Sequence, residues 1–343
     1  MGDVITVLGP VSAQHLGIVL PHEHLLLDLT CLWGAPRDPS RTPLIEMKVT
    51  AEAFETLSHD PYQCLDNLRL DDTVAAVDEL ALFAAAGGAT VVDLSSRTIG
   101  PYPDALRTIA GATGLNIVAS TGYYVRAAHP QSLAATPTEA VRDHMVRELT
   151  EGFAEAPGVR AGIIGEIGTS SPIHPDEERV LRAAAAAQRQ TGVGLNVHLA
   201  IFHQEGHRAL DILESAGADL SRVALSHLDE QIDTTYHLSL ARRGVFLEFD
   251  TFGSEAAFEH SGSREPSDGE RLGALCALLD RGLEDQVMLA QDVCTKMQWT
   301  RYGGRGYAHV LRTIVPALKA RGVSGDVIDA MLRRNPARLL AGE

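Results

Sequence analysis

Eight short apolar segments alternate with helical patterns along this 343-residue chain, and this rhythm constrains the fold more than any other feature. Segments such as residues 161–168 and 222–228 are apolar at most positions, as in strands that are buried on both faces. Strands that alternate with helices predict a parallel sheet covered by helices. Eight such units in roughly 300 residues fit a closed (β/α)8 TIM barrel better than an open doubly wound sheet.

The whole chain, residues 1–343, is predicted to form one barrel domain, because no linker interrupts the rhythm. The predicted strands cover residues 18–24, 89–96, 116–124, 161–168, 194–200, 222–228, 244–250 and 286–293. The predicted helices cover residues 73–86, 101–114, 138–156, 175–191, 207–216, 234–243 and 268–281, and extra C-terminal helices are expected at 306–321 and 324–340. An N-terminal β-hairpin over residues 3–18 is expected to turn at Gly9-Pro10. Residues 28–70 form a long irregular insertion, which is typical of a functional or capping segment.

Charge and composition exclude several classes of partner. The net charge is −16, from 29 basic and 45 acidic residues, and it disfavours nucleic acids and anionic membranes, both of which require a basic surface. There is no apolar run of about 20 residues and no secretory signal, and the four cysteines are scattered. No GxGxxG, Walker or GxSxG motif follows a predicted strand. A cytoplasmic location and a small-molecule substrate are therefore expected.

Two histidines, His22 and His24, lie one residue apart at the end of the first predicted strand. Side chains of a strand alternate with a period of two, so both imidazoles are expected on one face and Glu23 on the other. Imidazole is the commonest metal ligand and suits zinc and its neighbours. An isolated His-x-His motif is as often structural as metal-binding. The residues at the ends of the other strands are needed to distinguish the two interpretations.

Five of the eight predicted strands end in side chains of the metal-ligand type. In a (β/α)8 barrel the carboxyl ends of all strands meet at one mouth, where the catalytic groups of this fold lie. A single buried histidine or strand-end aspartate is usually a core residue or a helix cap, but a shared metal centre explains all six candidates together. These candidates are His22, His24, Glu166, His198, His227 and Asp292.

The same residues, in the same order, resemble the phosphotriesterase-like branch of the amidohydrolase superfamily. The similarity extends from the N-terminal hairpin to Asn335-Pro336. It implies two divalent metal ions that share a bridging carboxylate and a bridging hydroxide, with Zn²⁺ expected and Mn²⁺, Co²⁺ or Fe²⁺ as alternatives. The implied ligands are His22, His24 and Asp292 for one ion, and His198 and His227 for the other, with Glu166 as the bridge. Relatives are often homodimers, an expectation that rests on fold analogy alone.

One position departs from the better-known members, which bridge their metals with a carboxylated lysine directly after an Ala-Gly-Ile-Ile-like run. Here Gly165 holds that place and Glu166 follows it, so the chain resembles the glutamate-bridged subgroup called phosphotriesterase homology or phosphotriesterase-related proteins. A shift of one residue turns a side chain to the opposite face of a regular strand, which predicts a bulge or twist at Gly165-Glu166. If Glu166 points outward instead, the site holds one metal or none.

The resemblance implies that a hydroxide between the metals attacks the substrate while Asp292 accepts its proton and delivers it to the leaving group. This predicts hydrolysis of a carboxylic ester, lactone or N-acyl amide. The alternatives are a phosphotriesterase or phosphodiesterase and a non-catalytic ligand-binding protein on the same scaffold. Thr251 follows Asp250 where some phosphotriesterases have a histidine, which disfavours fast organophosphate turnover.

Substrate contacts are predicted from polar residues in the loops after the strands. Rim packing and solvated loop residues are the alternative interpretations. The candidates are Tyr123, Tyr124, Arg97, His203, Asp250, Lys296 and Arg305.

Overall fold

The computed structural model describes residues 2–100, 102–259 and 261–341. Eight parallel strands form one sheet in the order β14-β11-β10-β9-β8-β7-β6-β3, and β14 and β3 also lie side by side, so the sheet is a nearly closed barrel. The (β/α)8 prediction is confirmed. The strands are β3 (Ile18–Glu23), β6 (Gly88–Asp93), β7 (Asn116–Thr121), β8 (Ala161–Gly168), β9 (Leu195–His198), β10 (Val223–Leu225), β11 (Phe246–Phe249) and β14 (Val287–Leu289).

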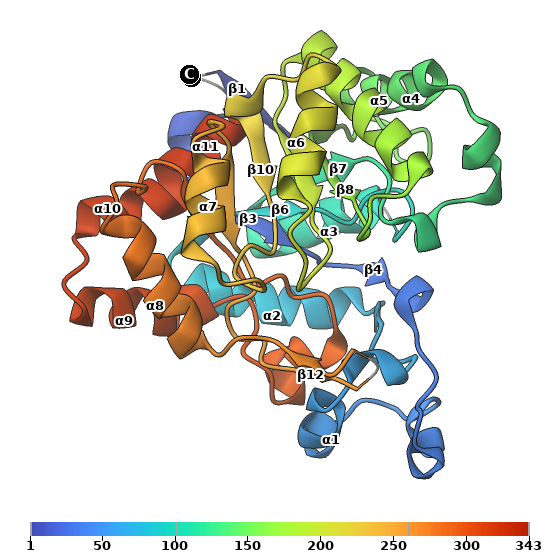
Figure 1. The fold of residues 1–343 in the computed structure, drawn as a ribbon, viewed down its shortest axis with the longest axis vertical. Coiled ribbons are helices and arrows are strands. Elements are labelled where there is room, and N and C mark those ends of the chain that lie inside the picture. The colour runs from blue at the N-terminus through green and yellow to red at the C-terminus, as the bar shows by residue number, and fades with distance from the viewer. Residues whose placement is uncertain (1, 101, 260, 342–343) are drawn as a thin grey trace.

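Helices surround the barrel and cover the outer face of the sheet (Figure 1). They are α2 (Thr73–Ala85), α3 (Pro103–Thr113), α4 (Thr138–Thr150), α5 (Pro175–Thr191), α6 (Gly206–Ser215), α7 (Thr234–Ala241) and α8 (Asp268–Leu279). Their ends follow local capping chemistry: the Asp72 carboxylate accepts from the first free N–H groups of α2, and Gly192 (φ 73°) ends α5 in the left-handed conformation. The C-terminal helices are α9 (Val315–Ala320), α10 (Gly325–Asp329) and α11 (Asn335–Ala341).

The N-terminal hairpin pairs β1 (Asp3–Thr6) with β2 (Gly9–Ser12), and Thr6 lies opposite Gly9. The chain therefore turns at Val7-Leu8, and the predicted turn at Gly9-Pro10 is wrong. The Thr6 hydroxyl closes the turn by donating to the Gly9 carbonyl (2.7 Å) and accepting from the Leu8 N–H (3.3 Å). The Val7 N–H donates to the carbonyl of Ile117 near the start of β7, so the hairpin covers the end of the barrel opposite the mouth.

The predicted irregular insertion carries short elements: β4 (Leu27–Asp28), α1 (Phe54–Ser58), β5 (Arg69–Leu70) and several 3₁₀ turns. It lies at the mouth of the barrel, where α1 and the loop strand β12 (Ala257–Phe258) share one end of the molecule (Figure 1). β12 pairs with β13 (Ser263–Arg264). Among the described residues, no helix has the length and apolarity needed to cross a membrane.

Candidate metal centre

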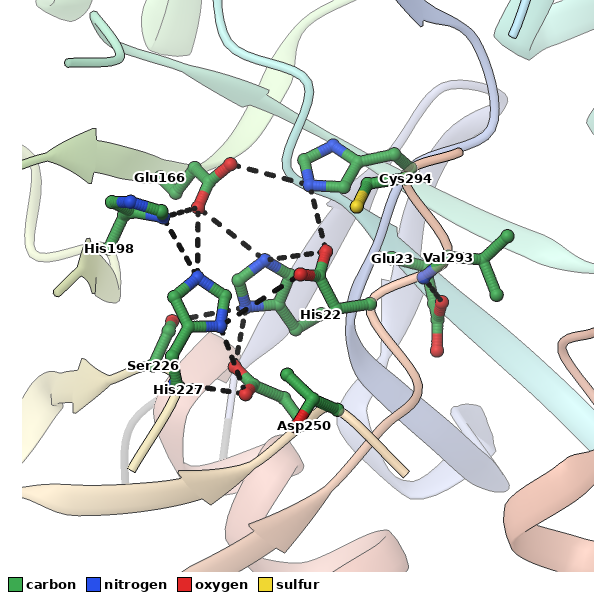
Figure 2. Close-up of polar contacts among 12 residues, drawn as sticks. His22, Glu23, Glu166, His198, Ser226, His227, Asp250, Val293 and Cys294 are labelled. Carbon is green, nitrogen blue, oxygen red and sulfur yellow. Dashed lines mark hydrogen bonds and ion pairs between the residues drawn. The ribbon is translucent and has the colours of Figure 1, made fainter. Parts of the chain in front are cut away.

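His22 in β3 and His24 directly after it both point toward Asp292, on one face as predicted; Figure 2 shows His22. The Nε2 atoms of His22 and His24 lie 3.6 and 3.2 Å from Oδ1 of Asp292, which follows β14. Glu23 points the other way and accepts the backbone N–H groups of Gln291 and Val293, each at 2.9 Å. The same strand thus supplies two possible metal ligands on one face and ties itself to the segment that carries Asp292 with the other.

Glu166 points into the mouth because β8 is irregular where it carries this residue. The register between β8 and β9 shifts between Ile164 and Ile167, which confirms the predicted bulge. Gly165 has φ 129°, and a Cβ there would lie 2.6 Å from the Asn196 carbonyl oxygen, so this position requires glycine.

The Glu166 carboxylate lies between the two groups of histidines (Figure 2). Its Oε1 is 3.3 Å from His24 Nε2, and its Oε2 is 3.1 Å from His198 Nδ1 and 3.8 Å from His227 Nε2. His227 and Asp292 have φ values of 60° and 45°, in the left-handed region that non-glycine residues rarely adopt. Such strained positions cluster at functional sites.

Asp250 orients two of the imidazoles. It is fully buried, and its carboxylate contacts His22 Nδ1 at 2.9 Å and His227 Nδ1 at 3.2 Å. Asp250 was predicted to contact the substrate, but both of its carboxylate oxygens face histidines instead. Carboxylate partners of this kind fix the ring so that the opposite nitrogen is free for a metal. Ser95 is the corresponding partner of His24 Nδ1 at 3.0 Å, and no sequence pattern marks it.

The electrostatics of the site favour added positive charge. Burial lowers the pKa of His22 and His24, but the neighbouring carboxylates outweigh it. They raise the pKa of His22 well above its usual value and that of His24 to about 9. Burial would raise the pKa of Glu166, yet the histidines around it hold that pKa well below its usual range.

The donor set fits a pair of divalent cations. The buried Nε2 of His22 and Oδ1 of Asp292 have no hydrogen-bond partner among the described residues. Ligand atoms within 4.8 Å of one another form the triplets His22–His24–Asp292 and Glu166–His198–His227, which match the two predicted ligand groups. A third triplet, His22–His227–Asp250, uses ring nitrogens that already contact Asp250, so the first two are the better metal sites.

A cavity of about 840 Å³ opens over this centre. Much of its lining is apolar or aromatic, from Leu29, Leu32, Phe54, Tyr62, Val125, Ile201, Phe202 and Phe258. Three predicted substrate contacts line it: Tyr124, His203 and Arg305. The Tyr124 ring packs against His198, with ring centroids 4.7 Å apart.

The other predicted substrate contacts lie elsewhere. The Tyr123 ring packs against His129 and His144, Arg97 pairs with Glu148 at 3.1 Å, and Lys296 pairs with Asp66 and Asp71 at 3.1 and 2.9 Å. None of the three is among the described residues that line the cavity. Their positions after strand ends were predicted, but the ion pairs and ring contacts that turn them away depend on distant residues.

Sequence reasoning missed a second charged cluster beside the cavity. Asp229 and Glu230 follow the metal-ligand candidate His227 by two and three residues, and both approach the buried guanidinium of Arg271, at 3.3 and 2.6 Å. Burial raises the pKa of Asp229 to about 7 and that of Glu230 to about 8, although Arg271 opposes the shift. Burial likewise raises the pKa of Glu265. The acidic pair Asp229-Glu230, one residue beyond the His227-Leu228 strand end, was the available signal.

Comparison with known proteins places the chain in a family. A profile described as the phosphotriesterase family matches residues 2–340. The chain belongs to the phosphotriesterase family. A protein named N-acetyltaurine hydrolase from Xenopus tropicalis is 36% identical to it, over 99% of this chain and 98% of the relative.

Two solved structures superpose closely on the barrel. A resiniferatoxin-binding protein from Rhodobacter sphaeroides has a TM-score of 0.97 and 39% identity, covering 99% of this chain and 95% of that one. The phosphotriesterase homology protein from Escherichia coli, complexed with phosphate in its active site, has a TM-score of 0.79 and 31% identity, covering 95% and 99%. With this family and these clustered ligand candidates, the chain is a metal-dependent hydrolase.

Proposed function

We propose that this phosphotriesterase-family enzyme hydrolyses an N-acyl amide, carboxylic ester or lactone, using two divalent ions, with zinc as the expected metal. The observation that carries the proposal is the convergence of six ligand side chains, among which His22 Nε2 and Asp292 Oδ1 are buried and make no hydrogen bond within the described residues. The relatives named N-acetyltaurine hydrolase favour the amide among the three bonds. Two ions bound there would lower the pKa of a shared water and polarise the carbonyl oxygen of the substrate.

The protein residues supply ligation, orientation and proton transfer. Asp250 holds His22 and His227 with their Nε2 atoms toward Glu166. Asp292 contacts His24 through Oδ1, and its side chain is 15% exposed, so it can exchange a proton with a group in the cavity. We assign Asp292 the transfer of the proton from the attacking water to the leaving group.

Tyr124, His203 and Arg305 are the substrate contacts that we retain, because each lines the cavity. Thr251 also lines the cavity, where the sequence comparison with some phosphotriesterases expects a histidine. Its hydroxyl donates to Glu230 (2.6 Å) and cannot act as an imidazole base. This favours an acyl bond over a phosphotriester.

A second candidate function is ligand binding without turnover. The similarity to a resiniferatoxin-binding protein and the large, mostly apolar cavity favour it. The complete set of ligand candidates, with Asp292, argues for hydrolysis, because a protein that only binds a ligand gains nothing from a proton-transfer carboxylate.

The test is a hydrolysis screen of zinc- or manganese-loaded protein with lactones, N-acyl amines, carboxylic esters and aryl phosphotriesters. Turnover of an acyl substrate that is lost on chelation and restored by metal supports the proposal, with Asp292→Asn as the blank. Tight binding of an apolar ligand with no turnover of any substrate supports the second candidate. Preferred turnover of the phosphotriester contradicts the choice of bond.

A further inference from the structure

One wall of the cavity carries carboxylates that are not part of the metal centre. Glu230 and Glu265 both line the cavity. The Glu230 side chain is 1% exposed. Its Oε1 accepts from Thr251 and Arg271, each at 2.6 Å, whereas its buried Oε2 has no partner among the described residues. A buried acceptor left unsatisfied is costly, so this oxygen can gain from a hydrogen bond or charge in the cavity.

Positive charge is scarce at this wall. The guanidinium of Arg271 pairs directly with Asp229 at 3.3 Å and Glu230 at 2.6 Å, and it acts on Glu265 only through its charge. Glu265 is held by neutral donors instead, the Ser254 hydroxyl and the Ala256 N–H, each at 2.6 Å. Three carboxyl groups against one guanidinium cannot all ionise without further positive charge, so the wall favours an added cation.

Aromatic rings line the same cavity, and the Tyr62 hydroxyl lies within electrostatic range of Glu265 and Glu230. The rings of Tyr62 and Phe258 have centroids 5.2 Å apart, and those of Phe202 and Phe258 are 5.7 Å apart. All three residues line the cavity. Aromatic faces combined with carboxylates are the usual surroundings of a bound quaternary ammonium or amine, since the ring quadrupole attracts a cation.

The two arginines that line the cavity do not cancel this charge. Arg126 is exposed and pairs with Asp176 at 3.0 Å. Arg305 is also exposed. A solvated arginine is screened by water and salt, whereas a buried carboxylate is not.

We propose that Glu230, Glu265 and the rings of Tyr62 and Phe258 form a subsite for a positively charged ammonium group of the substrate. This inference rests on the proposed function, since it places the ammonium on the part of an acyl substrate that lies away from the scissile bond. It defines the substrate class as an N-acyl amine or ester that carries a cationic group.

The direct test is isothermal titration calorimetry of the zinc-loaded full chain with three probes of similar size. They are choline, its neutral isostere 3,3-dimethylbutan-1-ol, and the anion isethionate. Choline is expected to bind at least roughly tenfold more tightly than the neutral isostere. Isethionate is expected to bind most weakly of the three. Equal binding of choline and the isostere, tighter binding of isethionate, or no binding of choline overturns the proposal.

Two variants locate the effect. Glu265→Gln and Glu230→Gln are each expected to reduce the choline preference to roughly threefold or less, because each removes one buried carboxyl group that can pair with the cation. Glu255→Gln is the matched control: Glu255 also lines the cavity but is exposed, so the preference should persist. The proposal fails if the control lowers the preference as much as both buried variants. If a substitution unfolds the chain, the ratio of choline to isostere affinity in the wild-type protein decides the test.

Acetyl esters of choline and of its neutral isostere separate this inference from the proposed function. Acetylcholine and 3,3-dimethylbutyl acetate are compared as substrates, and a lower KM is expected for acetylcholine. If neither ester nor any other acyl substrate is hydrolysed, the proposed function fails, while the choline ratio still reports on the subsite. If both esters are hydrolysed with the same KM, the subsite fails and the hydrolase stands.

Discussion

Two buried clusters of charged side chains open into the same cavity, and they differ in what balances their carboxylates. In the metal centre, Glu166 and Asp292 face histidines, and the pKa of both carboxyls is lowered despite burial. In the neighbouring cluster, Asp229, Glu230 and Glu265 share Arg271, and the pKa of all three carboxyls is raised.

Burial acts in the same direction on all five carboxyls, so the count of nearby cationic partners decides the outcome. The metal centre has four imidazoles that can be protonated or can bind metal ions. The acidic wall, formed by Asp229, Glu230 and Glu265, has one guanidinium. Its carboxyl groups must therefore retain protons or attract a cation from a ligand. The same buried residue type thus prepares one site for metal ions and the other for an organic cation.

The largest effect is expected from Asp292→Asn in the metal centre. The amide cannot accept the proton of the attacking water, so kcat/KM for the best acyl substrate should fall by roughly 10²–10⁴. Steady-state kinetics with the metal content of each sample measured will check this. Asp326→Asn, at an exposed ion pair with Arg334, is the matched control and should be fully active. Wild-type turnover by Asp292→Asn would contradict the catalytic role of the metal centre.

A large effect on stability is expected from Arg271→Met in the acidic wall. The substitution leaves the buried carboxylates without their guanidinium, which should lower the free energy of unfolding by about 3–5 kcal/mol. Urea denaturation at pH 8, where more of the wall is ionised, will measure it. Arg264→Met removes an exposed arginine that pairs with Glu270 and should change stability little. Equal effects of the two substitutions would show that the wall carries no buried charge.

The metal centre could largely be predicted from the sequence, whereas the acidic wall could not. The strand-end positions of His22, Glu166 and Asp292 predict their convergence, because parallel strands bring their carboxyl ends to one mouth. The glycine before Glu166 even predicts the bulge that aims it inward. Local pattern and fold class suffice for such residues.

The acidic wall was not predicted, because its charge balance depends on contacts between distant segments. Arg271 lies on α8, 41 residues beyond Glu230, and no spacing rule joins them. Asp250 was assigned to substrate for the same reason: a strand-end carboxylate is predictable, but whether it faces a ligand or two histidines is set by side-chain packing. The hairpin turn was misplaced because Thr6 closes it with a side-chain hydrogen bond that outweighs the Gly-Pro signal.

A smaller effect is expected from Asp250→Asn, which tests how the metal centre is supported. An amide cannot accept from both His22 and His227 as a carboxylate does, so the imidazoles should lose part of their fixed orientation. Metal affinity is expected to fall by about 10–100-fold, as measured by competition with a zinc chelator. Asp268→Asn, whose carboxylate contacts His309 at 2.6 Å instead, should leave the affinity unchanged. Unchanged affinity in Asp250→Asn would show that its two contacts are structural only.

The smallest effect is expected at Glu270, an exposed carboxylate near the wall whose pKa moves the opposite way. Hydrogen bonds from Arg264 and from Ser267, which caps α8, lower the pKa of Glu270 to about 2 from 4.5. A carboxyl with a lowered folded pKa stabilises the fold above pH 4.5 and loses that contribution as pH falls toward 2. Glu230, with its pKa raised to about 8, favours the fold at low pH and loses that contribution as pH rises through 8. Glu270→Gln should therefore lower Tm slightly at pH 7, and this difference should shrink between pH 4.5 and pH 3. A Tm difference that is constant over this range would mean that Glu270 acts through its hydrogen-bonding shape rather than its charge, and the contrast with the buried wall would then be one of burial alone.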